Sequence, residues 1–137
     1  LNLSLRIPPT LSPYKAHNVL EQLLTTDPPY GAKVTLDYHE PAQGWNAPAL
    51  APWLGEAMDE ASNTFFGQPA MHWGEGGTIP FMGMLGDRFP EAQFAITGVL
   101  GPESNAHGPN EFLHIGYAKK LTGCVTRILS KHFSRSR

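Results

Sequence analysis

The stretch "LNLSLRIPP", residues 1–9, decides the fold class that the sequence predicts. Its apolar residues occupy every second position, at Leu1, Leu3, Leu5 and Ile7, and polar residues lie between them. Such alternation is typical of a β-strand with one buried face. We therefore expect a sheet. Because the strand pattern already occupies the first residue, we also expect that the natural chain begins earlier.

A helix and a second strand are expected after this stretch. Ser12 and Pro13 are typical of a helix N-cap and of the first helical position, and an apolar stripe then runs to the helix breaker "DPPYG" at residues 27–31. A second alternating stretch, "AKVTLDYHE", covers residues 32–40. In this strand-helix-strand unit, Arg6 and His39 lie on the polar faces of their strands. They can converge on one cleft, or both can be ordinary solvated side chains.

The second part of the chain begins after a proline-rich stretch, "EPAQGWNAPALAP", at residues 40–52. Apolar residues at helical spacing predict a helix that ends near Gly67. A glycine-rich turn, a buried strand over residues 94–100 and a final helix from Pro109 to about Phe133 complete the expected order. We place the boundary between the two parts at residues 45 and 46.

Composition and charge exclude several classes of protein. The 137 residues carry 10 basic and 12 acidic side chains, a net charge of −2, so we expect no nucleic-acid partner. No apolar run approaches the roughly 20 residues of a membrane span, so we expect a soluble protein with no membrane partner. One cysteine excludes an internal disulfide, which fits a reducing compartment, and we expect a cytoplasmic protein. The single cysteine, Cys124, lies at helical spacing between apolar residues, which favours a packed thiol over a nucleophile.

Two loops in the second part contain residues with possible chemistry. In "GEGGTIP", residues 74–80, glycine amides can approach a carboxylate or an oxyanion closely. In "AHGPNE", residues 106–111, His107 precedes a proline that stiffens the loop, and a neutral imidazole is a good zinc ligand. Each loop taken alone is also compatible with an ordinary surface turn.

Four motifs resemble one known family when they are taken in order: "LSLRIPP" (3–9), "GWNAP" (44–48), "EGGTIPFM" (75–82) and "AHGPNEFLHIGYAKKL" (106–121). The chain resembles the cocatalytic zinc peptidases. This family includes carnosinase-type dipeptidases, glutamate carboxypeptidases, aminoacylases and succinyl-diaminopimelate desuccinylase. The similarity extends over essentially the whole chain and is closest to the dipeptidases. It implies hydrolysis of the amide bond of dipeptides or N-acyl amino acids.

The resemblance also implies roles for individual residues. His107 corresponds to a zinc ligand. Arg6 corresponds to the arginine that binds the terminal carboxylate of the substrate, and His39 to a catalytic histidine that polarises the scissile carbonyl. The glycine-rich turn corresponds to a lining of the substrate pocket, formed by Gly76, Gly77 and Thr78.

The chain lacks other parts of the family's active site. A complete site binds two zinc ions and uses a His-x-Asp motif and a Glu-Glu pair, and neither occurs in this sequence. We therefore expect the C-terminal portion of such an enzyme. Residues 1–45 should form half of a ferredoxin-like lid, and residues 46–137 the C-terminal part of an α/β catalytic domain. This chain alone should not hold zinc stably and should be inactive.

The expected partners follow from the same resemblance. The complete enzyme would bind a small peptide substrate. An incomplete lid leaves an unpaired edge strand, which predicts a homodimer that pairs through this strand. The alternative is a non-enzymatic oligomerisation or ligand-binding module derived from the same family.

Overall fold

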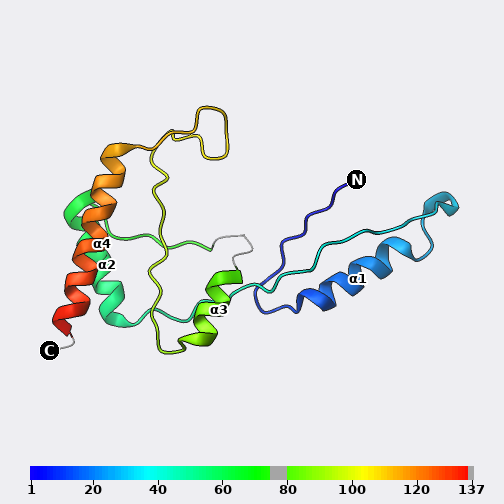
Figure 1. Ribbon diagram of the computed structural model, residues 1–137, viewed down its shortest axis with the longest axis horizontal. Helices are drawn as coiled ribbons and strands as arrows, with labels where there is room; N and C mark the ends of the chain where they lie inside the picture. Colours follow the sequence, from blue (N-terminus) through cyan, green and yellow to red (C-terminus); the bar gives the residue numbers. More distant parts are fainter. Residues whose placement is uncertain (75–79, 136–137) are drawn as a thin grey trace. The chain divides into compact units, whose positions relative to one another are not determined.

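The computed structural model describes residues 1–74 and 80–135, and its regular elements there are helices (Figure 1). They are, in chain order, α1 (Pro13–Thr25), the short 3-10 turn η1 (Pro29–Gly31), α2 (Pro52–Phe66), α3 (Pro80–Arg88) and α4 (Ile115–Arg135). The chain divides into two compact units, Leu1–Ala47 with Gly74–Ala92, and Pro48–Trp73 with Gln93–Arg137. Helices α1 and α3 belong to the first unit, and α2 and α4 to the second.

The predicted α/β fold, with half of a ferredoxin-like lid and part of an α/β catalytic domain, is wrong. No residue in the described ranges lies in a strand or a sheet. Alternation indicates which side chains would share a face, but a strand forms only where its backbone groups pair with a neighbouring strand. The described backbone bonds outside the helices close turns, caps and loops instead. Leu3 and Leu5 consequently remain 55% and 64% exposed.

Helix α1 confirms the predicted start and stop signals. The Ser12 side chain accepts a hydrogen bond from the Lys15 amide at 3.4 Å, and Pro13 follows at the first helical position. The helix ends at Thr25, just before the Asp-Pro-Pro sequence that cannot continue it. Local sequence alone was therefore sufficient to define this element.

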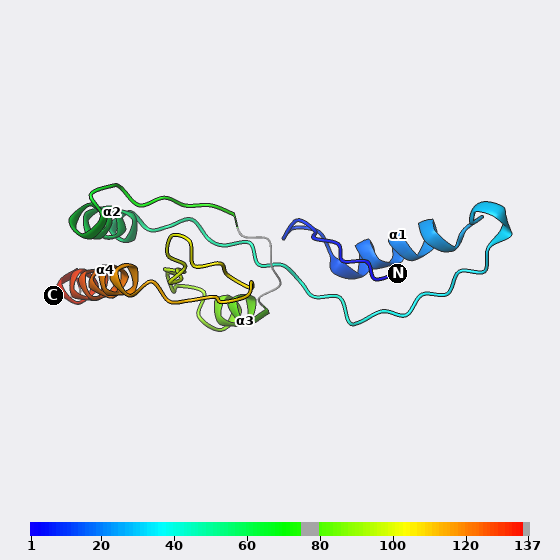
Figure 2. The same cartoon turned by 90° about the horizontal axis from the view of Figure 1, so that it is seen from above.

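The non-helical segment after η1 returns along α1 in the first unit (Figures 1 and 2). The Tyr38 ring packs against the His17 ring of α1 with a centroid distance of 3.9 Å. The Tyr14 hydroxyl donates a hydrogen bond to Glu40 Oε1 at 2.8 Å. The Gln43 side chain donates to the Pro9 carbonyl at 2.9 Å. Side-chain contacts, and not a backbone ladder, hold this segment in place.

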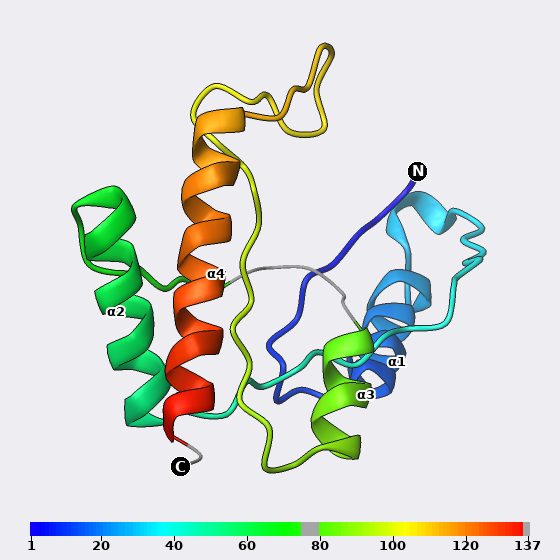
Figure 3. The ribbon, with the colours of Figure 1, turned by 60° about the vertical axis from the view of Figure 1, so that its left-hand side comes forward.

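Helices α2 and α4 pack against each other and form the core of the second unit (Figures 1 and 3). Small residues line the contact, where Ala57, Ala61 and Cys124 are buried together with Leu54. Burial of Cys124 confirms the predicted packed thiol, which is 7% exposed. Burial also raises the pKa of this thiol, because desolvation disfavours the thiolate.

Aromatic contacts at both ends show that α2 and α4 run antiparallel. Phe66, at the end of α2, packs on Tyr117 near the start of α4 with ring centroids 5.1 Å apart. Trp53, at the start of α2, lies 5.2 Å from the His132 ring and 4.3 Å from the Arg135 guanidinium carbon, both at the end of α4. Helix α2 ends at Gly67 in a left-handed conformation with φ 72°, as the sequence predicts.

The predicted start of the last helix was wrong. The helix was expected from Pro109 but begins at Ile115, because the residues in between form a closed loop of their own. Residues 94–100, predicted as a buried strand, are an extended connection in which Ile96 is 56% exposed. None of the helices described here is long and apolar enough to cross a membrane.

Candidate functional site

The loop between residues 101 and 114 is closed by its own hydrogen bonds. The Phe112 amide donates to the Ser104 carbonyl at 3.2 Å and joins the two arms of the loop. Within it, the Gly108 amide donates to the Asn105 carbonyl at 2.9 Å, and the Asn105 side-chain amide donates to the Pro109 carbonyl at 2.7 Å. Ser104 is 3% exposed. These bonds are made within the loop itself and hold its two arms together.

His107 lies within this closed loop with an exposed side chain. Its backbone amide donates a hydrogen bond to Glu111 Oε2 at 3.0 Å. Its φ is 60°, in the left-handed region that costs energy for residues with a Cβ. Glu103, Asn105 and Asn110 also have positive φ values. Residues with a Cβ in this backbone region cluster at active sites and ligand clamps, which makes this loop a candidate site.

The base of the loop is formed by Gly101 and His114. Gly101 is buried, and a Cβ built on it would lie 2.4 Å from His114 Cβ, so a larger residue does not fit. His114 Nδ1 accepts a hydrogen bond from the Tyr117 amide at 3.0 Å and thereby caps α4. Sequence reasoning missed this cap, because serine, threonine, asparagine and aspartate are the residues that signal a helix start.

The other predicted site residues lie elsewhere. Arg6 is exposed on the non-helical segment that precedes α1, and His39 is exposed between Tyr38 and Glu40, the two residues that contact α1. Both belong to the first unit, whereas His107 belongs to the second. The predicted turn at Gly76, Gly77 and Thr78 lies outside the described residues.

The described residues do not by themselves fit a zinc centre. They contain no group of three or more His, Cys, Asp or Glu side chains that could hold a metal ion. A catalytic zinc site usually has three protein ligands. His107 can therefore supply one ligand, and the described ranges do not complete the set around it.

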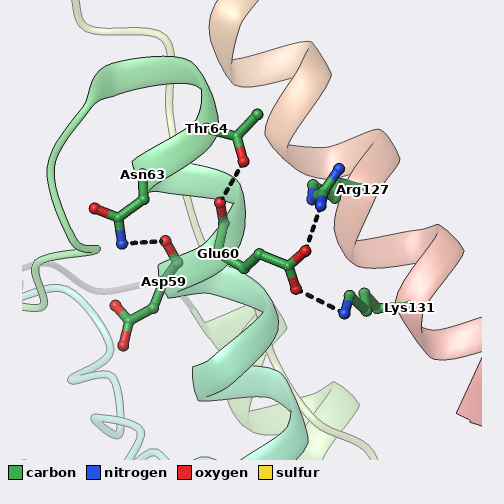
Figure 4. A network of polar contacts seen from close by, with 6 residues as sticks. All are labelled: Asp59, Glu60, Asn63, Thr64, Arg127 and Lys131. Carbon is green, nitrogen blue, oxygen red and sulfur yellow. Dashed lines mark hydrogen bonds and ion pairs between the residues drawn. The ribbon is translucent and has the colours of Figure 1, made fainter.

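An ion-pair network between α2 and α4 was not predicted from the sequence (Figure 4). The Glu60 carboxylate of α2 pairs with Arg127 and Lys131 of α4, with Lys131 Nζ 2.6 Å from Glu60 Oε2. The hydrogen bonds from Lys131 and Arg127 lower the pKa of Glu60 below its ordinary value. The spacing of four between Arg127 and Lys131 places both cations on one face of the helix. That spacing was the available signal, but it does not indicate that Glu60 is the partner of the two cations.

The same network borders a shallow groove with no catalytic arrangement. Ser130 and Ser134 line it together with the three charged residues. The Ser134 hydroxyl donates back to the Ser130 carbonyl at 3.0 Å, within the helix. Since the carboxylate is already paired with two cations, this group ties the helices together and leaves no free base. We therefore assign the candidate site to the loop at His107.

Comparison with known proteins links the chain to peptidases. No protein-family model matches it. It is 30% identical over 126 residues to a cysteinylglycine-S-conjugate dipeptidase from Corynebacterium striatum. The match covers 85% of this chain and 27% of that protein, so the chain spans about a quarter of its relative's length. This similarity supports a peptidase-like origin, does not identify the subfamily, and does not favour a non-enzymatic module.

Proposed function

We propose that this chain contributes substrate-binding and metal-binding residues to a zinc-dependent peptidase that hydrolyses dipeptides or N-acyl amino acids, in the manner of carnosinase-type dipeptidases. The observation that carries the proposal is the closed loop at His107, whose strained backbone presents an exposed imidazole. The 30% identity to a dipeptidase supports the same reaction class.

His107 is the proposed metal ligand. Its amide is held by Glu111, and the bonds of Asn105 fix the turn around it, so the backbone that carries the imidazole needs little reordering when an ion binds. A preorganised ligand binds more tightly because the entropy of ordering has already been lost. The other ligands would have to come from outside the described residues. We therefore expect the chain alone to bind zinc weakly and to show no hydrolysis.

Arg6 and His39 are the proposed substrate contacts. A guanidinium forms two parallel hydrogen bonds with a carboxylate, which suits Arg6 to the free C-terminus of a dipeptide. An imidazole can donate a hydrogen bond to a carbonyl oxygen and stabilise the charge that develops there, which is the role proposed for His39. Gly76, Gly77 and Thr78 are proposed to line the pocket that receives the substrate.

The test of the reaction uses the protein as its native cell makes it. We expect this protein to hydrolyse dipeptides, including a cysteinylglycine S-conjugate, with activity that a chelator removes and zinc restores. The His107→Ala variant should lose this activity, whereas His72→Ala, which changes another exposed histidine of the second unit, should keep it. Absence of hydrolysis in the native protein, or full activity in His107→Ala, would exclude the proposal.

The test of Arg6 separates carboxylate recognition from a structural role. Arg6→Ala should raise KM for a dipeptide with a free C-terminus and leave KM nearly unchanged for the same dipeptide with an amidated C-terminus. Arg88→Ala, which removes an exposed arginine of α3, should affect neither substrate. An equal loss for both substrates would show that Arg6 does not read the carboxylate.

Self-association of two copies is a separate proposal. The predicted pairing through an edge strand has no basis in the described residues, because they form no strand. What supports association is the exposed apolar row at the start of the chain, where Leu3 and Leu5 are more than half exposed. Sedimentation should show a dimer, and Leu3→Ser with Leu5→Ser should shift it to a monomer. A monomeric parent chain would exclude the proposal.

A further inference from the structure

The imidazole of His114 occupies the capping position of α4. Its Nδ1 accepts a hydrogen bond from the amide of Tyr117, three residues into the helix, at 3.0 Å. The His114 carbonyl accepts the first helical bond from Ala118 at 3.0 Å. This is the geometry that a capping serine or asparagine usually provides. An imidazole nitrogen can accept such a bond only while it carries no proton.

The same side chain closes the base of the His107 loop. Its Cβ and Cγ lie against Gly101, the first residue of the loop, so closely that no Cβ fits there. Three residues after Gly101, the Ser104 carbonyl accepts the hydrogen bond from the Phe112 amide that joins the two arms of the loop. The side chain that caps α4 therefore also packs against the first residue of the loop.

We infer that His114 is a positioning residue for the His107 loop, and that it holds the loop closed only while its imidazole is neutral. The inference goes beyond the proposed function, and it rests on that function only in giving His107 a ligand to bind. Acidification would then loosen the loop at its base.

Protonation of His114 opposes the cap in two ways. A proton on Nδ1 turns the acceptor into a donor that faces the Tyr117 amide, and the positive charge lies at the positive end of the helix dipole. The described contacts of the imidazole come from Gly101, Gly116 and Tyr117, none of which carries a compensating negative charge. The exposed position of His114 gives a proton direct access from solvent.

The charged and titratable groups on the neighbouring elements are Glu103, His107, Glu111, Tyr117, Lys119 and Lys120. Glu111 is engaged with the His107 amide. Lys120 lies over the Phe66 ring of α2 with its Nζ 5.4 Å from the centroid. Because all of these groups are retained when His114 alone is replaced, a matched variant separates its titration from theirs.

Two variants and two spectroscopic readouts test the inference on the intact chain, without metal or substrate. His114→Asn keeps a strong capping acceptor that does not titrate, and His114→Ala removes the acceptor. Long-range ¹H–¹⁵N spectra report which imidazole nitrogen carries the proton. Amide hydrogen exchange at Tyr117 and Phe112 reports the cap and the loop closure, compared between variants at the same pH.

We expect the Nε2–H tautomer of His114 at about pH 7.5. On going to about pH 5, protection of both amides in the parent chain should fall about tenfold relative to His114→Asn, the size expected for loss of one capping side chain. Equal pH dependence in the parent and His114→Asn would overturn the inference, and so would the Nδ1–H tautomer. A response at Tyr117 without one at Phe112 would also overturn it, because His114 would then cap α4 without positioning the loop.

If His114→Ala does not fold, the tautomer and the comparison with His114→Asn still decide the question. The peptidase proposal is tested by hydrolysis and these measurements are not. Failure of one can therefore be distinguished from failure of the other.

Discussion

Gly123 of α4 lies directly beneath the ring of Phe65 of α2, and a Cβ at Gly123 would come within 2.6 Å of two ring carbons. The absence of a side chain at this position lets the two helices approach where Ala57 and Ala61 are fully buried. The close approach of α2 and α4 therefore depends on Gly123. Glycine has a poor helix propensity, but here it leaves room for the Phe65 ring.

Gly123→Ala should destabilise the second unit even though alanine favours helices. The clash with Phe65 should cost about 1–3 kcal/mol, which outweighs a helix-propensity gain of about 1 kcal/mol. Gly55→Ala is the matched control, because Gly55 is also inside a helix and nothing lies within 4 Å of its Cβ position. That control should gain about 0.5–1 kcal/mol. Urea unfolding of both variants measures the difference, and equal stabilities would refute the predicted clash.

Glu60→Gln should lower stability near neutral pH and have little effect in acid. Lys131 and Arg127 lower the pKa of Glu60 in the folded chain. The stabilisation is therefore present above the ordinary pKa of glutamate and is lost as the pH falls through the folded value. Urea unfolding across this range should show the parent and the variant converging in acid. Glu56→Gln, which removes an exposed carboxylate of α2 with no described ion pair, should show no such convergence.

Tyr14→Phe should release the segment that carries His39. The hydrogen bond from Tyr14 to the Glu40 carboxylate, and then the charge of Glu40, raise the pKa of Tyr14. The stabilisation is present below the ordinary tyrosine pKa and is lost as the pH rises through the folded value. Urea unfolding should show the variant less stable than the parent at neutral pH, with the two converging in alkali. Tyr30→Phe, which changes a fully exposed phenol, should match the parent throughout.

Gly101→Ala should open the loop that presents His107. A methyl group would lie 2.4 Å from His114 Cβ, so either the loop arm or the imidazole must move. Exchange of the Phe112 amide should accelerate by about tenfold or more, as a clash of about 1–3 kcal/mol requires. Gly98→Ala is the control, since nothing lies within 4 Å of its Cβ position. Unchanged protection at Phe112 would show that the base of the loop can adapt.

Local signals in the sequence predicted α1 and α2, but not α3 or the start of α4, and pairing between distant segments could not be predicted at all. The Ser12 cap and the Gly67 stop are each determined by a few neighbouring residues, and both were confirmed. The alternation around Leu3 indicates a face but not a partner, and the described residues supply no partner strand. Propensity is local, whereas a sheet is a property of at least two segments.

In the candidate site, too, the local turn could be predicted from the sequence and the side-chain contacts could not. The turn at His107 was predicted from its glycine and proline neighbours, and the structure confirms a turn there. Its side-chain bonds from Asn105 and to Glu111 depend on rotamers that no sequence pattern specifies. The cap at His114 was missed, because a histidine at a helix start has no strong statistical signal. The late start of α4 follows from that cap.

The buried thiol of Cys124 is a built-in probe for separation of α2 and α4. The sequence has one cysteine, so any thiol reagent reports on this position alone. Since burial both shields the sulfur and raises its pKa, the closed pair should react slowly. The rate of Cys124 labelling therefore reports the opening of the α2–α4 pair. A change in that opening can be measured without adding a probe group to the chain by mutation.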